Sequence, residues 1–306
     1  MKLSNEELGT FFREIRKARK LTLKDISNEN VTAAQLSKFE RGISNLTFDR
    51  LFSVIDSLNM SIEEFAYAMN GYELNNFQSF IMEIENAYDR KDEFHLLKMK
   101  EQLFLTENVT TNDRIKRVLV ESHLWKLNWF LKTDYKVNRQ DAKYVADYLM
   151  SIDEWTNYEV YLFNEIIYFI SIDTVNVLAR EMIFRNSFYQ DILENKKTVL
   201  ICLLNIYNVM IHTGNKDISR FFRNKIKEVL PSNSNYLYEK ISFDCSKAVE
   251  DYVFNDSQDG LMKIKKIIGN LEELGLHEFS SQLEYDLKNI INHYSKGGGN
   301  PYDNSD

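Results

Sequence analysis

The sequence predicts an all-α protein with two helical domains and a short disordered tail. The 306 residues include only two prolines and ten glycines, so few positions would interrupt a helix. Apolar residues recur at helical spacing through most of the chain, which is also longer than one small core requires. We expect a five-helix domain in residues 1–70, a helical-repeat domain in residues 71–295 and a disordered tail in residues 296–306.

The five helices of the first domain are predicted from their capping residues. Asn, Ser and Thr side chains accept a hydrogen bond from a backbone N–H one turn further on, and one such residue precedes or begins each predicted helix. Ser61 and Glu64 have the spacing of a capping box. The expected helices are Asn5–Lys20, Leu23–Ser27, Thr32–Gly42, one after Thr47 and one after Ser61.

The helix expected at Thr32–Gly42 has the composition of a DNA-recognition helix. Leu36 and Phe39 are expected to attach it to the core. Its other face has small side chains at the N-terminal end and basic ones at the C-terminal end, which suits the major groove. The short or basic polar groups belong to Gln35, Ser37, Lys38 and Arg41, whereas Ala33 shares the side of Leu36, Phe39 and Glu40. An ordinary amphipathic surface helix has the same pattern, so the neighbouring segments decide between the two interpretations.

The charge is unevenly distributed along the chain. Residues 1–67 hold ten Lys or Arg and ten Asp or Glu, whereas the remaining residues hold 28 basic and 36 acidic side chains, which gives the net charge of −8. Six basic residues and only one acid, Glu14, occur between Arg13 and Lys24. Because phosphate contacts depend on a local basic stripe, this segment favours DNA binding by the first domain.

The second domain is predicted to be a helical repeat. Short polar links separate its helices, so neighbouring helices are expected to be antiparallel. Three helices begin near Trp155, Asn195 and Asn235, a spacing of about 40 residues that is typical of helical-pair repeats. We expect a tetratricopeptide- or HEAT-like superhelix with a concave wall, and a compact irregular bundle is the alternative.

Two stripes of polar residues on apolar helices are candidates for a ligand surface. An Asn side chain offers both a donor and an acceptor, which match the N–H and C=O groups of an extended peptide. The same Asn residues would serve equally well in bonds to nearby loops or in contact with water. The stripes are Asn157, Tyr161, Asn164 and Tyr168 on the helix expected at Trp155–Ile170, and Ile201, Asn205, Asn208 and His212 on the helix expected at Lys196–His212.

The first domain resembles the repressor-type helix-turn-helix of phage and bacterial regulators. The resemblance rests on Arg16, on Leu23 and Ile26, and on Leu36–Gly42. It implies that Arg16 and Glu40 form a structural pair. It also implies that bases are read by Ala33, Ala34 and Lys38. The two alanines depart from the glutamines that are common at these positions in the family, so we expect methyl contacts with thymine in place of hydrogen bonds. The side chains suited to phosphates are Thr22, Thr32, Ser37 and Arg41, whereas Arg13 and Lys17 fit either phosphate contacts or a solvated face.

The order of the domains resembles the Rgg-type (GadR/MutR-like) transcriptional regulators of Gram-positive bacteria. The similar segments are Arg13–Gly42, Glu64 with Phe65, Trp155–Asn164 and Leu203–Asn208. The resemblance implies a homodimer that binds promoter DNA and a short, imported, mostly hydrophobic signalling peptide. It further implies that Asn164 and Asn205 clamp the peptide backbone. Because apolar residues in Tyr236–Tyr294 exceed the needs of one core, we expect dimerisation through these C-terminal helices.

Other classes of function find little support in the sequence. No phosphate loop, nucleophile elbow or His-Glu-x-x-His motif is present, so we expect no enzyme, no cofactor and no metal site. The start of the chain is unlike a signal peptide, no stretch is suited to span a membrane, and the two cysteines fit buried thiols in a reduced cytoplasm. A repressor or antitoxin-like module whose repeat domain binds a protein partner or a small metabolite remains the alternative.

Overall fold

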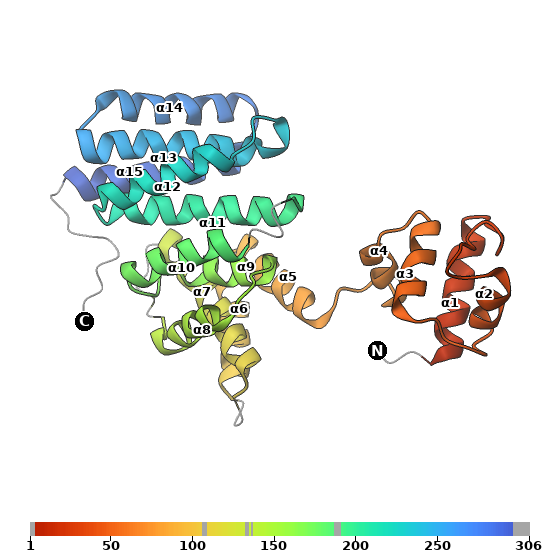
Figure 1. The fold of residues 1–306 in the computed structure, drawn as a ribbon. Coiled ribbons are helices and arrows are strands. Elements are labelled where there is room, and N and C mark those ends of the chain that lie inside the picture. Colours follow the sequence, from red (N-terminus) through yellow and green to blue (C-terminus); the bar gives the residue numbers. More distant parts are fainter. Residues whose placement is uncertain (1–3, 106–108, 132–134, 136, 187–190, 296–306) are drawn as a thin grey trace. The chain divides into compact units, whose positions relative to one another are not determined.

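The computed structural model describes residues 4–105, 109–131, 135, 137–186 and 191–295, and of these residues 129–131 and 293–295 only in their backbone. Every regular element within these ranges is a helix, which confirms the predicted all-α class (Figure 1). The chain divides into two compact units, Met1–Asn86 and Ala87–Asp306. The domain limits expected after residues 70 and 295 stay predictions, and the tail expected at residues 296–306 lies outside the described residues.

The first unit contains four helices and the beginning of a fifth. They are α1 (Asn5–Ala18), α2 (Ala33–Glu40), α3 (Phe48–Ser57), α4 (Ile62–Met69) and α5 (Asn76–Asp89), which continues into the second unit. One buried core joins α1 to α4. Its residues are Phe12, Ile26, Val31, Leu36, Phe39, Val54, Ile55, Leu58 and Phe65. Leu36 and Phe39 thus attach α2 to the core, as expected.

The capping residues explain most of the helix ends in this unit. Thr32 with Gln35, and Ser61 with Glu64, form reciprocal capping boxes at the starts of α2 and α4. The cap of α1 is Ser4, one residue before the expected Asn5, because Ser4 has its own box partner in Glu7. Gly42, with φ of 69°, turns the chain away after α2.

The prediction of a helix at Leu23–Ser27 was wrong, because this segment forms a turn over Leu23–Ile26. The backbone N–H and the hydroxyl of Thr22 both donate to Oδ2 of Asp25, each at 2.7 Å. The N–H of Asp25 in turn donates to Oγ1 of Thr22 at 3.2 Å. These local bonds stabilise a turn at the expense of a longer helix.

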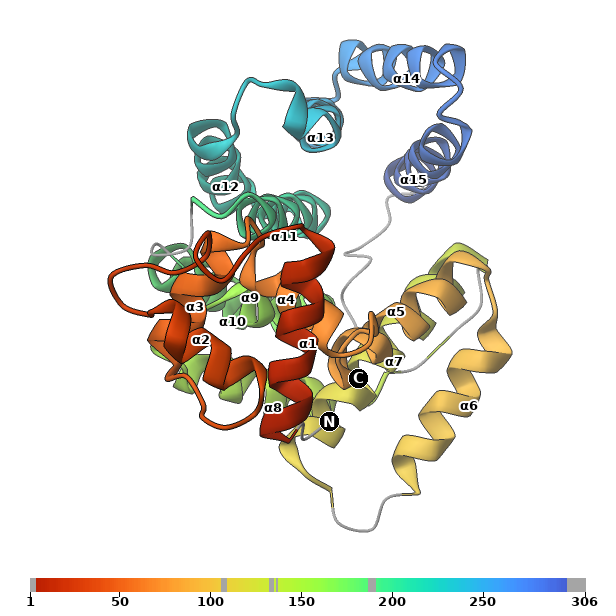
Figure 2. The same cartoon turned by 90° about the vertical axis from the view of Figure 1, so that its right-hand side faces the viewer.

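The second unit is a stack of helix pairs. After α5 its helices are α6 (Glu93–Phe104), α7 (Thr111–Leu131), α8 (Arg139–Ser151), α9 (Asn157–Ile166), α10 (Ile172–Arg185), α11 (Leu193–His212), α12 (Lys216–Val229), the short 3₁₀ helix η2 (Ser234–Tyr236), α13 (Leu237–Asn255), α14 (Gln258–Glu273) and α15 (His277–Ser295). Contacts link α7 to α9, α9 to α11 and α11 to α13, so alternate helices form one row, which we call the central row. Helices α11 to α15 follow one another in an arc (Figure 2). This arrangement is the predicted helical repeat, with starts at Asn157, Leu193 and Leu237.

The helix expected at Trp155–Ile170 is shorter in the structure. It becomes α9, which ends at Ile166, and residues 167–169 form a turn. The reason is the next helix, whose N-cap Ser171 accepts a hydrogen bond from the N–H of Thr174. The chain must therefore reverse before Ser171. Consequently Tyr168 leaves the helical stripe on which the sequence pattern placed it.

Both cysteines have buried, unpaired thiols, as expected from their apolar surroundings. Burial raises the pKa of Cys202, and it raises the pKa of Cys245 to about 12, so both thiols stay protonated at neutral pH. Among the helices in the described part of the chain, none combines the length and apolar character that a membrane span requires.

Two glycines on α14 provide a test of how closely α13 and α14 pack. A Cβ atom on Gly260 would lie 2.5 Å from the carbonyl oxygen of Ala248 on α13, whereas one on Gly269 would meet nothing within 4 Å. We predict that Gly260→Ala lowers the free energy of unfolding by about 1–3 kcal/mol, since the backbone of α13 must move. Gly269→Ala should raise it by about 0.5–1 kcal/mol, because Ala favours a helix more than Gly does. Urea denaturation followed by circular dichroism measures both, and equal effects would contradict the close packing.

Candidate functional site

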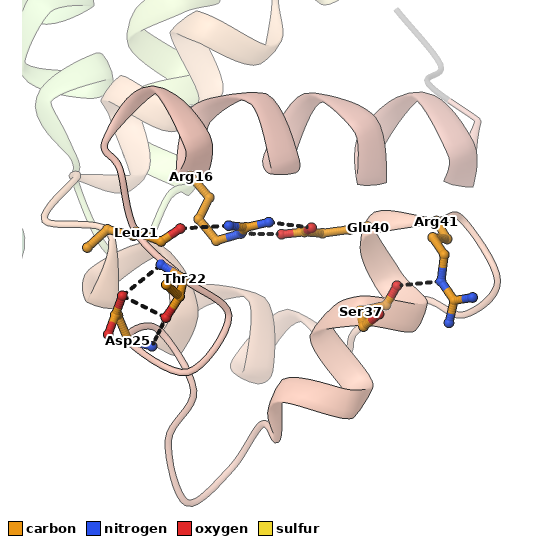
Figure 3. Close-up of polar contacts among 7 residues, drawn as sticks. All are labelled: Arg16, Leu21, Thr22, Asp25, Ser37, Glu40 and Arg41. Carbon is orange, nitrogen blue, oxygen red and sulfur yellow. Dashed lines mark hydrogen bonds and ion pairs between the residues drawn. The ribbon is translucent and has the colours of Figure 1, made fainter.

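A buried ion pair holds α2 against α1. Nε and Nη2 of Arg16 donate to the two carboxylate oxygens of Glu40 at 2.6 and 2.8 Å, and Nη1 donates to the carbonyl oxygen of Leu21 at 2.6 Å (Figure 3). Both side chains are buried. The Glu40 carboxylate raises the pKa of Arg16, against the effect of burial. The two residues that the helix-turn-helix resemblance paired thus form a fork-to-fork contact that fixes the orientation of α2.

The opposite side of α2 carries polar and basic side chains toward solvent. Thr32, Ala34, Lys38 and Arg41 are exposed, and Ala33, Gln35 and Ser37 are half-buried. Arg13 and Lys17 are exposed one turn apart on α1, and Thr22 is exposed at the turn before α2. All ten residues considered for DNA contact therefore lie at least partly on the surface of the first unit.

Some of these side chains already have partners within the unit. Oε1 of Gln35 accepts hydrogen bonds from the backbone N–H and the hydroxyl of Thr32 at 2.9 and 3.1 Å. Nε of Arg41 donates to the carbonyl oxygen of Ser37 at 3.0 Å, which leaves the outer guanidinium nitrogens directed away from the helix (Figure 3). Thr22 is engaged with Asp25. Lys38 is exposed in the middle of α2, so it is the cation on this face that is best placed for a contact with DNA.

In the second unit, Asn164 of α9 and Asn205 of α11 contact each other directly. Nδ2 of Asn205 donates to Oδ1 of Asn164 at 2.9 Å. Both residues are half-buried. Two amides from neighbouring helices of the central row thus form one polar surface, which we call the amide pair. The sequence placed both residues on candidate stripes but gave no sign of this hydrogen bond.

The other residues of the two stripes lie around the amide pair. On α9, Asn157 is exposed at the start of the helix and Tyr161 is half-buried one turn before Asn164. On α11, Ile201, Asn208 and His212 are all half-buried, and together with Asn205 they lie on successive turns. Tyr168 lies in the turn after α9, where its ring stacks on Trp125 of α7 with centroids 5.0 Å apart. The stripes therefore extend along α9 and α11, and Tyr168 belongs instead to an aromatic contact with α7.

A buried carboxylate beside the amide pair was missed by sequence reasoning. Glu165 of α9 accepts hydrogen bonds from Nζ of Lys126 at 2.8 and 2.7 Å and from Oγ of Ser122 at 2.6 Å, both donors on α7. Nδ2 of Asn164 lies 3.4 Å from Oε1 of Glu165. The available signal was an acid within the apolar run Leu162–Ile167, which stands out on a core helix.

The charges around Glu165 keep it ionised. Burial alone would raise its pKa, but Lys126, His123 and the hydrogen bonds from Lys126 and Ser122 outweigh burial and hold the pKa at about 2. His123 has Nδ1 3.6 Å from Glu165, and burial lowers the pKa of this imidazole. Lys126 is therefore the principal cation facing the carboxylate. Among the described residues, no group of three or more His, Cys, Asp or Glu side chains is arranged to hold a metal ion.

Comparison with known families and structures gives consistent results. Residues 97–285 match the family described as HTH-type transcriptional regulator Rgg, C-terminal domain, and residues 12–65 match a helix-turn-helix family. The crystal structure of the Streptococcus dysgalactiae SHP pheromone receptor Rgg2 has a TM-score of 0.75 at 22% identity, covering 92% of this chain and 99% of that one.

Two further solved structures have the same fold. A candidate transcriptional regulator from Listeria monocytogenes EGD-e has a TM-score of 0.76 at 17% identity, over 95% of this chain and 99% of that one. The PrgX/cCF10 complex has a TM-score of 0.66 at 14% identity, over 93% and 92% of the two chains. The fold is therefore shared along nearly the whole length of these proteins.

The depressed pKa of Glu165 predicts a specific pH dependence of stability. Because its pKa is lower in the folded than in the unfolded chain, Glu165 stabilises the fold above about pH 4.5, and this contribution is lost as the pH falls toward about 2. We predict that Glu165→Gln lowers the free energy of unfolding by on the order of 3 kcal/mol at pH 7 and by progressively less below pH 4.5.

Urea denaturation at a series of pH values measures this difference. Glu228→Gln serves as the control, since Glu228 pairs with Lys225 at an exposed position and should matter little. A difference between Glu165→Gln and the unsubstituted chain that stayed constant down to pH 3 would contradict the assignment of a buried, ionised carboxylate.

Proposed function

Because the chain belongs to the Rgg family of HTH-type transcriptional regulators, we propose that it is a cytoplasmic, non-enzymatic regulator that binds promoter DNA as a homodimer. We further propose that a short hydrophobic signalling peptide, bound across the amide pair, controls it as in quorum sensing. The observation that carries the peptide assignment is the direct contact of Asn164 with Asn205 at a half-buried surface of the repeat.

The DNA assignment is supported by the construction of α2. A short helix that is fixed by the Arg16–Glu40 fork, and that carries exposed Lys38 and Arg41, fits the major groove beside two phosphate backbones. Lys38 is proposed to reach bases or the adjoining phosphates, and Arg41 and Thr32 are proposed to contact phosphates. The exposed methyl of Ala34 suits a thymine methyl group.

The peptide assignment is supported by chemistry at the amide pair. An extended peptide presents alternating N–H and C=O groups that must find partners when they leave water. The amides of Asn164 and Asn205 supply both donors and acceptors, and half-buried Tyr161, Ile201 and Asn208 surround them. One structural neighbour is named as an SHP pheromone receptor, and another as a bacterial peptide pheromone/receptor complex.

The C-terminal helices are the proposed dimer contact. Leu237, Tyr238, Met262, Leu274 and Leu276 are exposed apolar residues on or beside α13, α14 and α15. Pairing through them would set the separation of two recognition helices over two half-sites of one operator. A peptide changes DNA binding only if it binds the two states of the dimer with different affinity, so we propose that it alters the curvature of the central row.

Replacing Lys38 tests the DNA-reading face. We predict that Lys38→Ala weakens binding to promoter DNA about tenfold, since one cationic contact is lost, and leaves peptide affinity unchanged. Electrophoretic mobility shift at several salt concentrations measures the effect, with Lys227→Ala at an exposed position of α12 as the control. Unchanged operator affinity in Lys38→Ala would show that another surface reads the DNA.

Replacing Asn205 tests the peptide site. Short hydrophobic peptides encoded beside the gene, labelled with fluorescein, serve as probes in fluorescence polarisation. We predict that Asn205→Ala weakens their binding by about ten- to a hundredfold, because one or two hydrogen bonds to the peptide backbone are lost, while DNA binding without peptide is retained. Asn224→Ala, at an exposed position of α12, should bind as the parent does. If no such peptide binds the parent chain, a metabolite or a protein partner becomes the better assignment.

A further inference from the structure

A continuous line of hydrogen bonds runs from α7 through α9 to α11. Lys126 and Ser122 of α7 donate to Glu165, Nδ2 of Asn164 faces Oε1 of Glu165 at 3.4 Å, and Nδ2 of Asn205 donates to Oδ1 of Asn164 at 2.9 Å. The line ends at the amide pair, half-exposed, and begins at a carboxylate that is only 3% exposed. A buried charge and a surface recognition group are therefore connected through Asn164.

Only one arrangement of donors and acceptors along this line is favourable. An ionised carboxylate can only accept hydrogen bonds, so Asn164 must turn its Nδ2 group toward Glu165. Its Oδ1 atom then faces α11, so Asn205 must donate to it through Nδ2, because the oxygen of Asn205 cannot donate. Reversing either amide would place two oxygens or two NH₂ groups against each other. Oδ1 of Asn205 is thus left as an acceptor, with no donor to it among the described residues.

The carboxylate is suited to this role because its state does not change under physiological conditions. Lys126 pairs with it at 2.7 Å while remaining partly exposed, so the buried charge is compensated without filling the surface above. Ser122 adds a second donor from the same helix. Glu165 itself is too deeply buried to touch a peptide that lies over the central row.

We propose that Glu165 is a positioning residue of the peptide site, which fixes the direction of both amides so that Asn205 presents its oxygen to a peptide N–H. This inference rests on the proposed function. A peptide meets a preset pattern of donor and acceptor and does not have to reorient two amides during binding, so less of the binding free energy is lost.

A double-mutant cycle tests the proposal. We expect Glu165→Gln to weaken binding of the fluorescein-labelled hydrophobic peptides about tenfold, because a neutral amide accepts either orientation of Asn164. In the Asn164→Ala background the same substitution should change affinity less than twofold, since the residue through which Glu165 acts is gone. A loss of similar size in both backgrounds would overturn the proposal, because it would indicate a general structural effect.

Glu250 provides a matched control for burial and charge. It lies on α13, is 5% exposed and accepts hydrogen bonds from Tyr207, Ser219 and Arg223. Glu250→Gln should lower thermal stability as Glu165→Gln does but leave peptide affinity within twofold of the parent. If Glu165→Gln fails to fold, the double variant Lys126→Met/Glu165→Gln removes both charges together and should show the same tenfold loss. Parent-like affinity in that folded double variant would overturn the proposal.

A readout without peptide separates this inference from the proposed function. In protein labelled with ¹⁵N at Asn only, the side-chain amide signals of Asn164 and Asn205, assigned with the two Ala variants, should both shift in Glu165→Gln. They should not move in Glu250→Gln. Shifts without any peptide binding would support the positioning contact and contradict the peptide site, whereas parent-like signals would overturn the positioning role by themselves.

Discussion

The repeat unit depends on the compensation of carboxylates that its helices bury. Glu121 on α7, Glu165 on α9 and Glu250 on α13 are each at most 5% exposed. Each is paired with a cation from another helix: Lys100 of α6 at 2.9 Å, Lys126 of α7 at 2.7 Å and Arg223 of α12 at 2.6 Å. An unpaired buried carboxylate would cost several kcal/mol, so these contacts restrict which helices can be neighbours and how they are turned.

The two units orient their proposed recognition groups by related means. In the first, the Glu40 carboxylate accepts two hydrogen bonds from Arg16. This ion pair fixes the orientation of α2, so its polar face lies toward solvent. In the second, the Glu165 carboxylate directs two neutral amides. In both cases an ionised group that is itself withdrawn from solvent sets the geometry of residues at the surface. A carboxylate is well suited for this because it only accepts, so it imposes a direction on whatever donates to it.

Much of the fold could be predicted from local chemistry. The capping boxes at Thr32 and Ser61 and the glycine at position 42 determine helix ends through bonds between residues close in sequence. The spacing of the repeat follows from the polar links between helices. The turn at Leu23–Ile26 was mispredicted because Thr22 and Asp25 satisfy the backbone locally, a competition that periodicity does not register.

The candidate site was less accessible from the sequence. Asn164 and Asn205 could each be placed on a polar stripe, but their hydrogen bond depends on the register between α9 and α11, which no local pattern determines. Glu165 was overlooked because the sequence does not say which acid on an apolar helix faces inward. Tyr168 was misplaced by the early end of α9, since the cap at Ser171 overrides helical periodicity.

Ion pairs between helices of different hairpins restrict how such a protein can change over evolutionary time. Repeat arrays are often lengthened, shortened or shuffled, because each module contacts only its neighbours and the modules are nearly interchangeable. Here Glu165, in the hairpin that contains α9, is paired with Lys126 of the preceding hairpin. Deleting the preceding hairpin, or duplicating the one that contains α9, would leave a buried carboxylate without its cation. These two hairpins are therefore expected to be kept or lost together.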